Sequence, residues 1–279
     1  MTSLALTTAD SATMLRRNLK HQLRYPSLTL MLAGLPIVFL LLFVYVFGGQ
    51  LGSGLGANGL GANGLGASGQ PHGDRSAYLA YVVPGILIVT VASAALGTAI
   101  SVASDMTGGI IDRFRTMAIT RAAVLTGHVV GSLLQTLAVL TLVTAVALAL
   151  GFRPTANALE WLAAAGILLL FAFALIWLSA ALGLAAKSVE TASNTPMFLT
   201  LLPFLSSGFV PTETMPAGLR QFAAYQPFTP VTQTVRGLLT GGPVGVHAVA
   251  AVAWSLGITL ASYLWALHLY NHRRAADPK

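Results

Sequence analysis

Long uninterrupted apolar runs constrain this chain more than any other feature of its sequence. Crossing about 30 Å of hydrocarbon takes roughly 20 mainly apolar residues in a helix. Only 8% of the 279 residues are charged, whereas a soluble domain carries about 25%. The runs are continuous rather than alternating, which favours helices over a membrane barrel. We therefore predict an all-α polytopic membrane protein in which residues 1–279 form one transmembrane domain. Its six predicted transmembrane helices span residues 28–47, 78–103, 122–150, 161–186, 195–210 and 247–270.

The distribution of Lys and Arg predicts the orientation of these helices. Six crossings leave both termini on one side, which receives 11 of the 15 basic residues, against 4 on the other side. Basic residues accumulate in cytoplasmic loops, so both termini are predicted to be cytoplasmic. The first basic cluster abuts a full-length apolar run, so we expect this run to remain uncleaved.

Several classes of function lack the residues that they need. The predicted spans contain no Asp, Glu, Lys or Arg, which argues against proton coupling within this chain. The segment from Ala181 to Ser188 is the nearest approach to a phosphate-binding loop, but it has alanines where that loop needs glycines. There is no cysteine, no HExxH pair and no GxSxG elbow. We therefore predict no catalytic, metal or cofactor site, and the scattered basic residues do not indicate nucleic-acid binding.

A basic amphipathic helix is predicted over residues 10–24, and Pro26 is expected to end it. Leucines recur at every fourth position beside a basic stripe, as in helices that lie in the headgroup plane. A simple positive-inside anchor is the alternative interpretation. The residues concerned are Leu15, Arg16, Leu19, Lys20, Leu23 and Arg24.

The first outer loop contains a short repeat. Between Leu55 and Gly69 a unit of five residues recurs three times, with two glycines in each unit. Such a segment buries too little apolar surface to offset the conformational entropy that it would lose on ordering. We interpret residues 51–69 as a flexible insertion without chemistry.

The fifth predicted span combines polar residues with Pro196 and Pro203. Prolines remove backbone hydrogen bonds, and interrupted helices in transporters tend to line cavities. The span is therefore our candidate transport path, although hydroxyl groups that pack between helices would give the same pattern. The candidate path residues are Asn194, Thr195, Thr200, Ser206 and Ser207.

Two connections between predicted spans have sequence patterns that indicate short helices instead of simple loops. On the cytoplasmic side, residues 110–117 alternate apolar and charged positions, which predicts a short amphipathic helix that either docks on a partner or lies on the membrane. On the outer side, residues 211–239 are apolar but broken by prolines, which favours two short re-entrant helices. The candidate docking residues are Ile111, Asp112, Arg113, Phe114 and Arg115. The candidate outer-gate residues are Phe209, Pro211, Glu213, Met215, Pro216 and Phe222.

Two stretches of the sequence resemble a known family. They are GIIDRFRTMAITRAAVLTGHVVGSLL (Gly109 to Leu134) and LPFLSSGFVPTETMPAGLRQFAAYQPFTPVTQTVRGLL (Leu202 to Leu239). Both resemble the membrane subunits of ABC-2 type exporters, in particular the daunorubicin-resistance-type drug permeases. Ala118 stands where that family commonly has proline, and the Gly-rich insertion lengthens the first outer loop.

The resemblance implies a complex of two membrane subunits, either two copies of this chain or one copy and a related permease. It also implies two separate ATP-binding subunits that bind ATP and Mg, and a location in the bacterial plasma membrane. In this picture residues 110–117 form the coupling helix, residues 10–24 the interfacial connecting helix and residues 211–239 the re-entrant helices. The second and fifth spans flank the transport path.

The sequence leaves the cargo open. An amphipathic drug, antibiotic or lipid-like molecule suits the apolar fifth span. A polysaccharide or glycolipid permease shares the architecture but needs a wider polar and aromatic channel, and a membrane scaffold or sensor subunit is a non-transport alternative.

Overall fold

The fold was derived from a computed structural model, which describes residues 26–47, 75–107, 121–186 and 188–272. Within these ranges every regular element is a helix. The longer α-helices are α2 (Pro26–Leu42), α4 (Arg75–Thr107), α6 (Arg121–Ala149), α7 (Ala158–Ala185) and α12 (Gly245–His272). The shorter α-helices are α8 (Val189–Asn194), α9 (Met197–Leu201), α10 (Ala217–Tyr225) and α11 (Phe228–Thr240). A π-helix, η1 (Phe43–Phe47), continues α2, and the 3-10 helices are η2 (Leu202–Leu205) and η3 (Thr212–Thr214).

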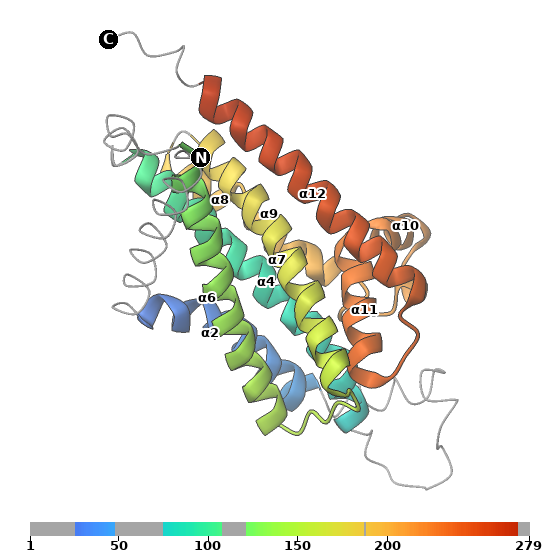
Figure 1. The fold of residues 1–279 in the computed structure, drawn as a ribbon. Helices are drawn as coiled ribbons and strands as arrows, with labels where there is room; N and C mark the ends of the chain where they lie inside the picture. Colours follow the sequence, from blue (N-terminus) through green and yellow to red (C-terminus); the bar gives the residue numbers. More distant parts are fainter. Residues whose placement is uncertain (1–25, 48–74, 108–120, 187, 273–279) are drawn as a thin grey trace, which may run out of the picture.

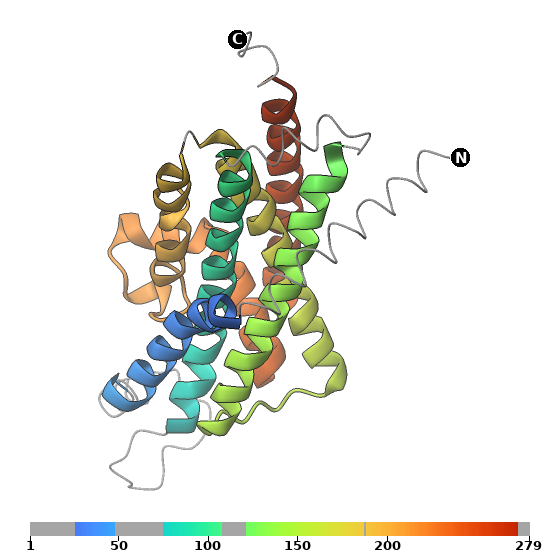
Figure 2. The same ribbon diagram turned by 90° about the vertical axis from the view of Figure 1, so that its left-hand side faces the viewer.

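Helices α4 and α7 form the middle of an elongated bundle (Figure 1). Helices α2 and α6 pack against α4 on one side, while α11 and α12 pack against α7 on the other. Figure 2 shows α2 at the edge of the bundle, beside α4 and α6. The core is continuous through α4, α6, α7 and α11, with Ile86, Val143, Phe171 and Val235 among its fully buried side chains.

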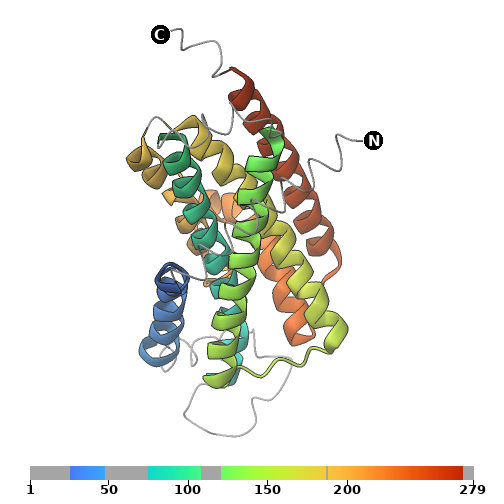
Figure 3. The ribbon, with the colours of Figure 1, turned by 60° about the vertical axis from the view of Figure 1, so that its left-hand side comes forward.

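The burial of the long helices differs widely. In the most apolar window of α4, 83% of residues are buried, whereas the figure is 17% in α12. Figure 3 shows α12 along the outside of the bundle, in contact with it on one face. Apolar side chains such as Val249, Leu256 and Leu260 therefore remain exposed on α12, as expected for a helix whose other faces meet lipid.

Four of the described helices are long and apolar enough to cross a membrane: Ser76–Ser104, Gly127–Ala149, Ala158–Ala185 and Gly245–Leu269. They correspond to the second, third, fourth and sixth predicted spans. The first predicted span is represented by a shorter apolar helix, Leu32–Val46. The all-helical membrane class is thus confirmed. Among the described residues, however, four helices are long and apolar enough to cross a membrane, compared with the six predicted spans.

The fifth predicted span differs most from its prediction. A single helix over residues 195–210 is not formed; the chain instead runs through α9 and η2 into turns after Leu205. Pro196 is the N-cap of α9, and Pro203 lies at the start of η2. Because proline has no backbone N–H, each one ends a helical hydrogen-bond ladder at that point.

The segment after these turns contains two short helices, as the proline pattern of residues 211–239 predicts. Pro216 precedes α10 and Pro227 precedes α11. Helix α11 ends at Gly241, whose φ of 76° is left-handed and favours glycine. Helix α11 is buried against α4, α7 and α12, whereas α10 contacts chiefly α11 and η3.

Helix α7 has a well-formed N-terminus. The Asn157 side chain accepts a hydrogen bond from the Glu160 backbone N–H at 2.9 Å, and the Glu160 carboxylate accepts one from the Asn157 backbone N–H at 2.7 Å. This reciprocal capping box satisfies two backbone donors that a helix otherwise leaves open. It fixes the point at which the chain turns back from α6 into α7.

Candidate functional site

The broken fifth segment creates a local problem of backbone hydrogen bonding. After η2 the chain is no longer helical, so the carbonyls and N–H groups near Ser206, Ser207 and Gly208 lack helical partners, yet all three residues are buried. Such backbone is tolerated in a membrane protein only when other groups satisfy it. The groups that do so come from α4, from α11 and from the corner between α10 and α11.

The α10–α11 corner supplies the first of these groups. The Gln226 side-chain amide donates to the Leu205 carbonyl at 2.6 Å and to the Leu202 carbonyl at 3.4 Å. The Thr229 hydroxyl accepts from the Ser207 backbone N–H at 3.2 Å and donates to the Ala223 carbonyl at 2.5 Å. The corner therefore caps the C-terminal end of η2.

Arg236 on α11 supplies most of the rest. Its Nη2 donates to the carbonyls of Ser207, Tyr81 and Gly208 at 2.9, 3.0 and 3.3 Å. Its Nη1 donates to the Gln233 side-chain oxygen at 3.3 Å. The guanidinium carbon lies 4.0 Å from the centroid of the Tyr81 ring, and the Tyr81 hydroxyl also donates to the Ser207 carbonyl at 3.2 Å. A half-buried cation is thus held by carbonyl dipoles and an aromatic face instead of a carboxylate.

We call the set Tyr81, Ser207, Gly208, Gln226, Thr229 and Arg236 the polar junction. It joins the fifth segment to α4 on one side and to α11 on the other. Three of its buried polar atoms have no partner among the described residues, namely Ser207 Oγ, Gln226 Oε1 and Arg236 Nε. Each unpaired buried atom costs about 1–3 kcal/mol of stability. The three unpaired atoms therefore lower the stability of this arrangement.

Two glycines allow the backbones to meet at the polar junction. A Cβ atom added to Gly85 of α4 would lie 2.7 Å from the Gly208 carbonyl oxygen. A Cβ atom added to Gly208 would lie 3.2 Å from the Gly85 Cα. Since neither residue has a Cβ, the fifth segment lies directly on α4.

An aromatic cluster continues from the polar junction towards α2. The Phe204 and Phe209 rings stack with centroids 4.9 Å apart, and Phe43 stacks on Phe209 at the same distance. Phe39 meets Phe204 edge to face at 5.1 Å. We call Phe39, Phe43, Phe204 and Phe209 the aromatic cluster. It connects the first apolar helix to the fifth segment at the π-helix η1, an element that often occurs at functional sites.

Comparison with known proteins identifies the family of the chain. Residues 11–240 match the model of the ABC-2 type transporter family. The chain belongs to this family. A daunorubicin resistance ABC transporter permease protein, DrrB1 of Streptomyces coeruleorubidus, is 29% identical over 259 residues, which cover 92% of this chain and 82% of that protein. A probable doxorubicin resistance ABC transporter permease protein, DrrC of Mycobacterium tuberculosis H37Rv, is 22% identical over 177 residues, 63% of this chain and 64% of that protein.

The resemblance to ABC-2 permeases inferred from the sequence is therefore confirmed. An ABC-2 transporter chain with long apolar helices is a multi-pass membrane protein. The predicted coupling residues 111–115 and the predicted interfacial residues 15–24 lie outside the described part of this ABC-2 chain, and their roles remain predictions.

The structure places the five candidate path residues in three different settings. Ser207 is buried in the polar junction, and Ser206 is buried beside it, where its Oγ donates to the Pro203 carbonyl at 2.5 Å and accepts from the Gly208 N–H at 3.1 Å. Thr200 bonds to the Met197 carbonyl within its own helix at 2.7 Å. Asn194 and Thr195 are exposed at the end of α8.

The candidate gate residues are likewise divided. Phe209 belongs to the aromatic cluster. Pro211 and Met215 flank η3 and are half-buried, while Glu213 is exposed within it. Pro216, which precedes α10, and Phe222 within it are both exposed. The Phe209 ring packs on the Phe43 ring of the neighbouring element η1, whereas α10 contacts chiefly α11 and η3 in this ABC-2 chain.

Sequence reasoning missed Arg236, Tyr81 and Gln226. By sequence alone, Arg236 is one of the four basic residues assigned to the outer side. Its neighbours Val235 and Leu239, both fully buried, show that it lies on an apolar helix. An isolated arginine in such a stretch is the signal that could have identified it, because a buried cation requires dedicated partners.

Proposed function

We propose that this chain is the membrane-spanning permease subunit of an ATP-driven exporter for an amphipathic drug, antibiotic or lipid-like molecule. The observation that carries the proposal is the family match over residues 11–240, together with a relative named for daunorubicin resistance that aligns over 92% of the chain. The apolar character of the fifth segment and the aromatic cluster suit a cargo with apolar and ring surfaces.

In this proposal the chain crosses the bacterial plasma membrane six times, with both termini in the cytoplasm. Helix α2 with η1 forms the first crossing, and the broken segment from α8 to η2 forms the fifth. Helices α10 and α11 are the re-entrant helices on the outer side. The excess of Lys and Arg on the predicted cytoplasmic side supports this orientation.

A topology experiment tests the orientation. The chain has no cysteine, so single cysteines introduced at Ser68 and at Ala276 report without background. Cysteine at position 68 should react with a membrane-impermeant thiol reagent added to intact cells, whereas cysteine at position 276 should react only after permeabilisation. The reverse pattern of labelling would overturn the proposed orientation.

The energy source lies in a partner. Separate ATP-binding subunits hold ATP and Mg, this chain carries no cofactor, and a second copy of it or a related permease completes the membrane part. Residues 111–115 seat the coupling helix in the ATPase, and residues 15–24 form the interfacial helix. Movement of the coupling helices shifts the membrane subunits between inward-open and outward-open states.

The polar junction is the proposed position of the outer gate, next to a path lined by the fifth segment. Its unpaired buried atoms support this role, because they reduce the stability of the closed arrangement relative to one in which water or cargo reaches them. Helix α4 and the fifth segment meet backbone to backbone at Gly85 and Gly208, so at that point no side chain has to be unpacked when they separate.

The function is tested by reconstituting the chain with its ATP-binding partner in lipid and measuring ATPase activity against amphipathic drugs and lipids. Drug-dependent stimulation is expected in the wild type. Phe114→Ala should reduce this stimulation by roughly tenfold, because losing a contact worth about 1.4 kcal/mol changes an equilibrium by that factor. Thr116→Ala, two residues away, is the matched control and should behave as wild type.

Two outcomes would count against the proposal. Stimulation by polysaccharides or glycolipids alone would reassign the cargo class. A stable complex whose ATPase activity responds to no compound would favour a scaffold or sensor subunit.

A further inference from the structure

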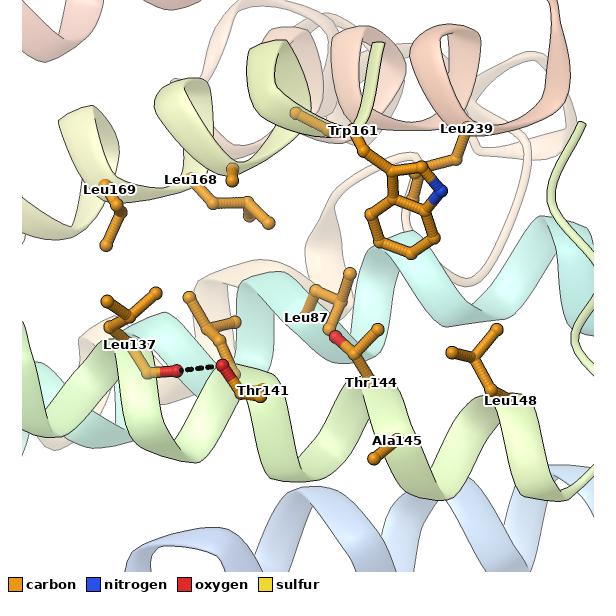
Figure 4. Close-up of a pocket in the computed structure, with 13 residues that line it drawn as sticks. Leu87, Leu137, Thr141, Thr144, Ala145, Leu148, Trp161, Leu168, Leu169 and Leu239 are labelled. Carbon is orange, nitrogen blue, oxygen red and sulfur yellow. Dashed lines mark hydrogen bonds between the residues drawn. The ribbon is translucent and has the colours of Figure 1, made fainter. Parts of the chain in front are cut away.

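An apolar cavity lies between α6 and α7, and no residue of the polar junction lines it (Figure 4). Its volume is about 360 Å³. The floor is buried and comes from four elements, whereas the α6 rim is exposed. The floor residues include Leu87, Leu140, Leu168 and Leu239, and the rim includes Leu137 and Ala145.

The residues that line this cavity favour binding of a hydrocarbon group. Of its 13 lining residues, only Thr141, Thr144 and Trp161 carry a polar side-chain atom. The Thr141 hydroxyl is already bonded to the Leu137 carbonyl at 2.8 Å. An apolar cavity of about 150 Å³ stays free of water and takes up benzene. A cavity of more than twice that volume with no charged lining therefore favours an apolar occupant over water.

One end of the cavity is marked by residues typical of the membrane interface. Trp161 projects into the cavity from the first turn of α7, next to Leu148 and Leu239 (Figure 4). The exposed Arg153 lies at the same end, because its Nη1 donates to the Leu148 carbonyl at 2.7 Å and to the Phe152 carbonyl at 3.1 Å. Tryptophan and arginine at one end of an apolar helix pair suit the headgroup level of a bilayer.

The charge at this end is free to meet an anion. The bonds of Arg153 to protein use Nη1, and a guanidinium has five N–H donors. The Glu160 carboxylate accepts a hydrogen bond from the Asn157 N–H in the capping box. A phosphate that approaches from the membrane surface thus finds a cation at the rim and an apolar cavity below it.

We propose that this cavity holds one acyl chain of an anionic phospholipid whose phosphate contacts Arg153. Lipid is favoured over other occupants because α6 and α7 are membrane-crossing helices with apolar rim residues exposed. Lipid also combines a hydrocarbon tail with a phosphate at the required end. The proposal concerns a structural lipid and is independent of the cargo.

Native mass spectrometry of the purified full-length chain tests the proposal, with phosphatidylglycerol and phosphatidylcholine as probes. The wild type should retain one phosphatidylglycerol in preference to phosphatidylcholine. Ala165→Phe fills the cavity from α7, and retention should fall by roughly tenfold because the buried acyl contacts are lost. Ala163→Phe is the matched control, since Ala163 is exposed two residues away and does not line the cavity; it should retain the lipid.

A second pair of variants separates tail from headgroup. Ala145→Phe fills the cavity from the exposed α6 rim, where folding is least at risk, and should reproduce the loss. Arg153→Gln should abolish the preference for phosphatidylglycerol while a lipid of either kind is retained. Equal lipid retention in all filling variants and the Ala163→Phe control would overturn the proposal.

A fluorescence measurement tests the same site without filling the cavity, so its result does not depend on whether the filling variants fold. In a chain with Trp177, Trp254 and Trp265 replaced by Phe, brominated phosphatidylglycerol should quench Trp161 fluorescence at low mole fraction, and unlabelled phosphatidylglycerol should reverse the quenching. Quenching no stronger than that by brominated phosphatidylcholine would overturn the proposal. So would displacement of the lipid by an exported drug, or a disulfide between two copies through cysteines placed at position 145.

Discussion

Replacing Arg236 with alanine is expected to destabilise the protein on the order of 3 kcal/mol and to abolish export. The change removes the Arg236 donor from the buried Gly208 carbonyl and leaves the Ser207 carbonyl with the Tyr81 hydroxyl alone, and a buried polar group left unpaired costs about 1–3 kcal/mol. It also removes the cation from the Tyr81 ring. The measurement is the thermal unfolding midpoint in lipid nanodiscs, taken together with drug transport in vesicles.

Two variants control this prediction. Arg220→Ala removes an exposed arginine from α10, so it should change neither the midpoint nor transport. Arg236→Lys keeps the charge but lacks the planar fork that reaches several carbonyls at once, and it should fall between wild type and Arg236→Ala. If Arg236→Ala unfolded at the temperature of Arg220→Ala, the guanidinium would not be holding the fifth segment.

The second large effect is expected at Gly85. A methyl group there would lie 2.7 Å from the Gly208 carbonyl oxygen, and that neighbour is backbone that cannot rotate away. Gly85→Ala should therefore push the fifth segment off α4 and cost about 1–3 kcal/mol, as overpacking does. The unfolding midpoint and the rate of drug export are the measurements.

Gly166→Ala is the matched control for Gly85→Ala, because nothing lies within 4 Å of the added Cβ atom on α7. It should be neutral or stabilising by up to about 1 kcal/mol, the helix-propensity gain of alanine over glycine. Combining Gly85→Ala with Arg236→Ala should cost less than the sum of the two, because both disrupt the same contact. Full additivity would mean that the glycine contact and the arginine act independently.

The long helices could be predicted from the sequence because hydrocarbon imposes one simple requirement on them. Apolar runs of about 20 residues must be helical in lipid. The predicted spans 78–103, 122–150, 161–186 and 247–270 accordingly lie within helices α4, α6, α7 and α12, with only small differences at their ends. The prolines of the fifth run predicted its interruption but not its separation into α9, η2 and a set of turns.

The polar junction could not be predicted, because it depends on distant segments. Arg236 contacts the carbonyl of Tyr81, 155 residues earlier in the chain, and the carbonyl of Ser207. Carbonyl acceptors are present in every residue, so no sequence pattern distinguishes them. Ser206 and Ser207 could be identified because serine is unusual in an apolar run. Gly85 and Gly208 could not, because their role depends on the absence of a Cβ atom where two backbones meet.

The difference in burial between α4 and α12 has a consequence for sequence variation. Nearly every side of α4 meets protein, so a substitution there is limited by volume, and even a change between two apolar residues meets a close-packed interior. Most of α12 faces outward, so substitutions there are limited chiefly by polarity. Homologous chains should therefore diverge freely along α12 among Leu, Ile, Val and Phe, while α4 keeps the sizes of its side chains.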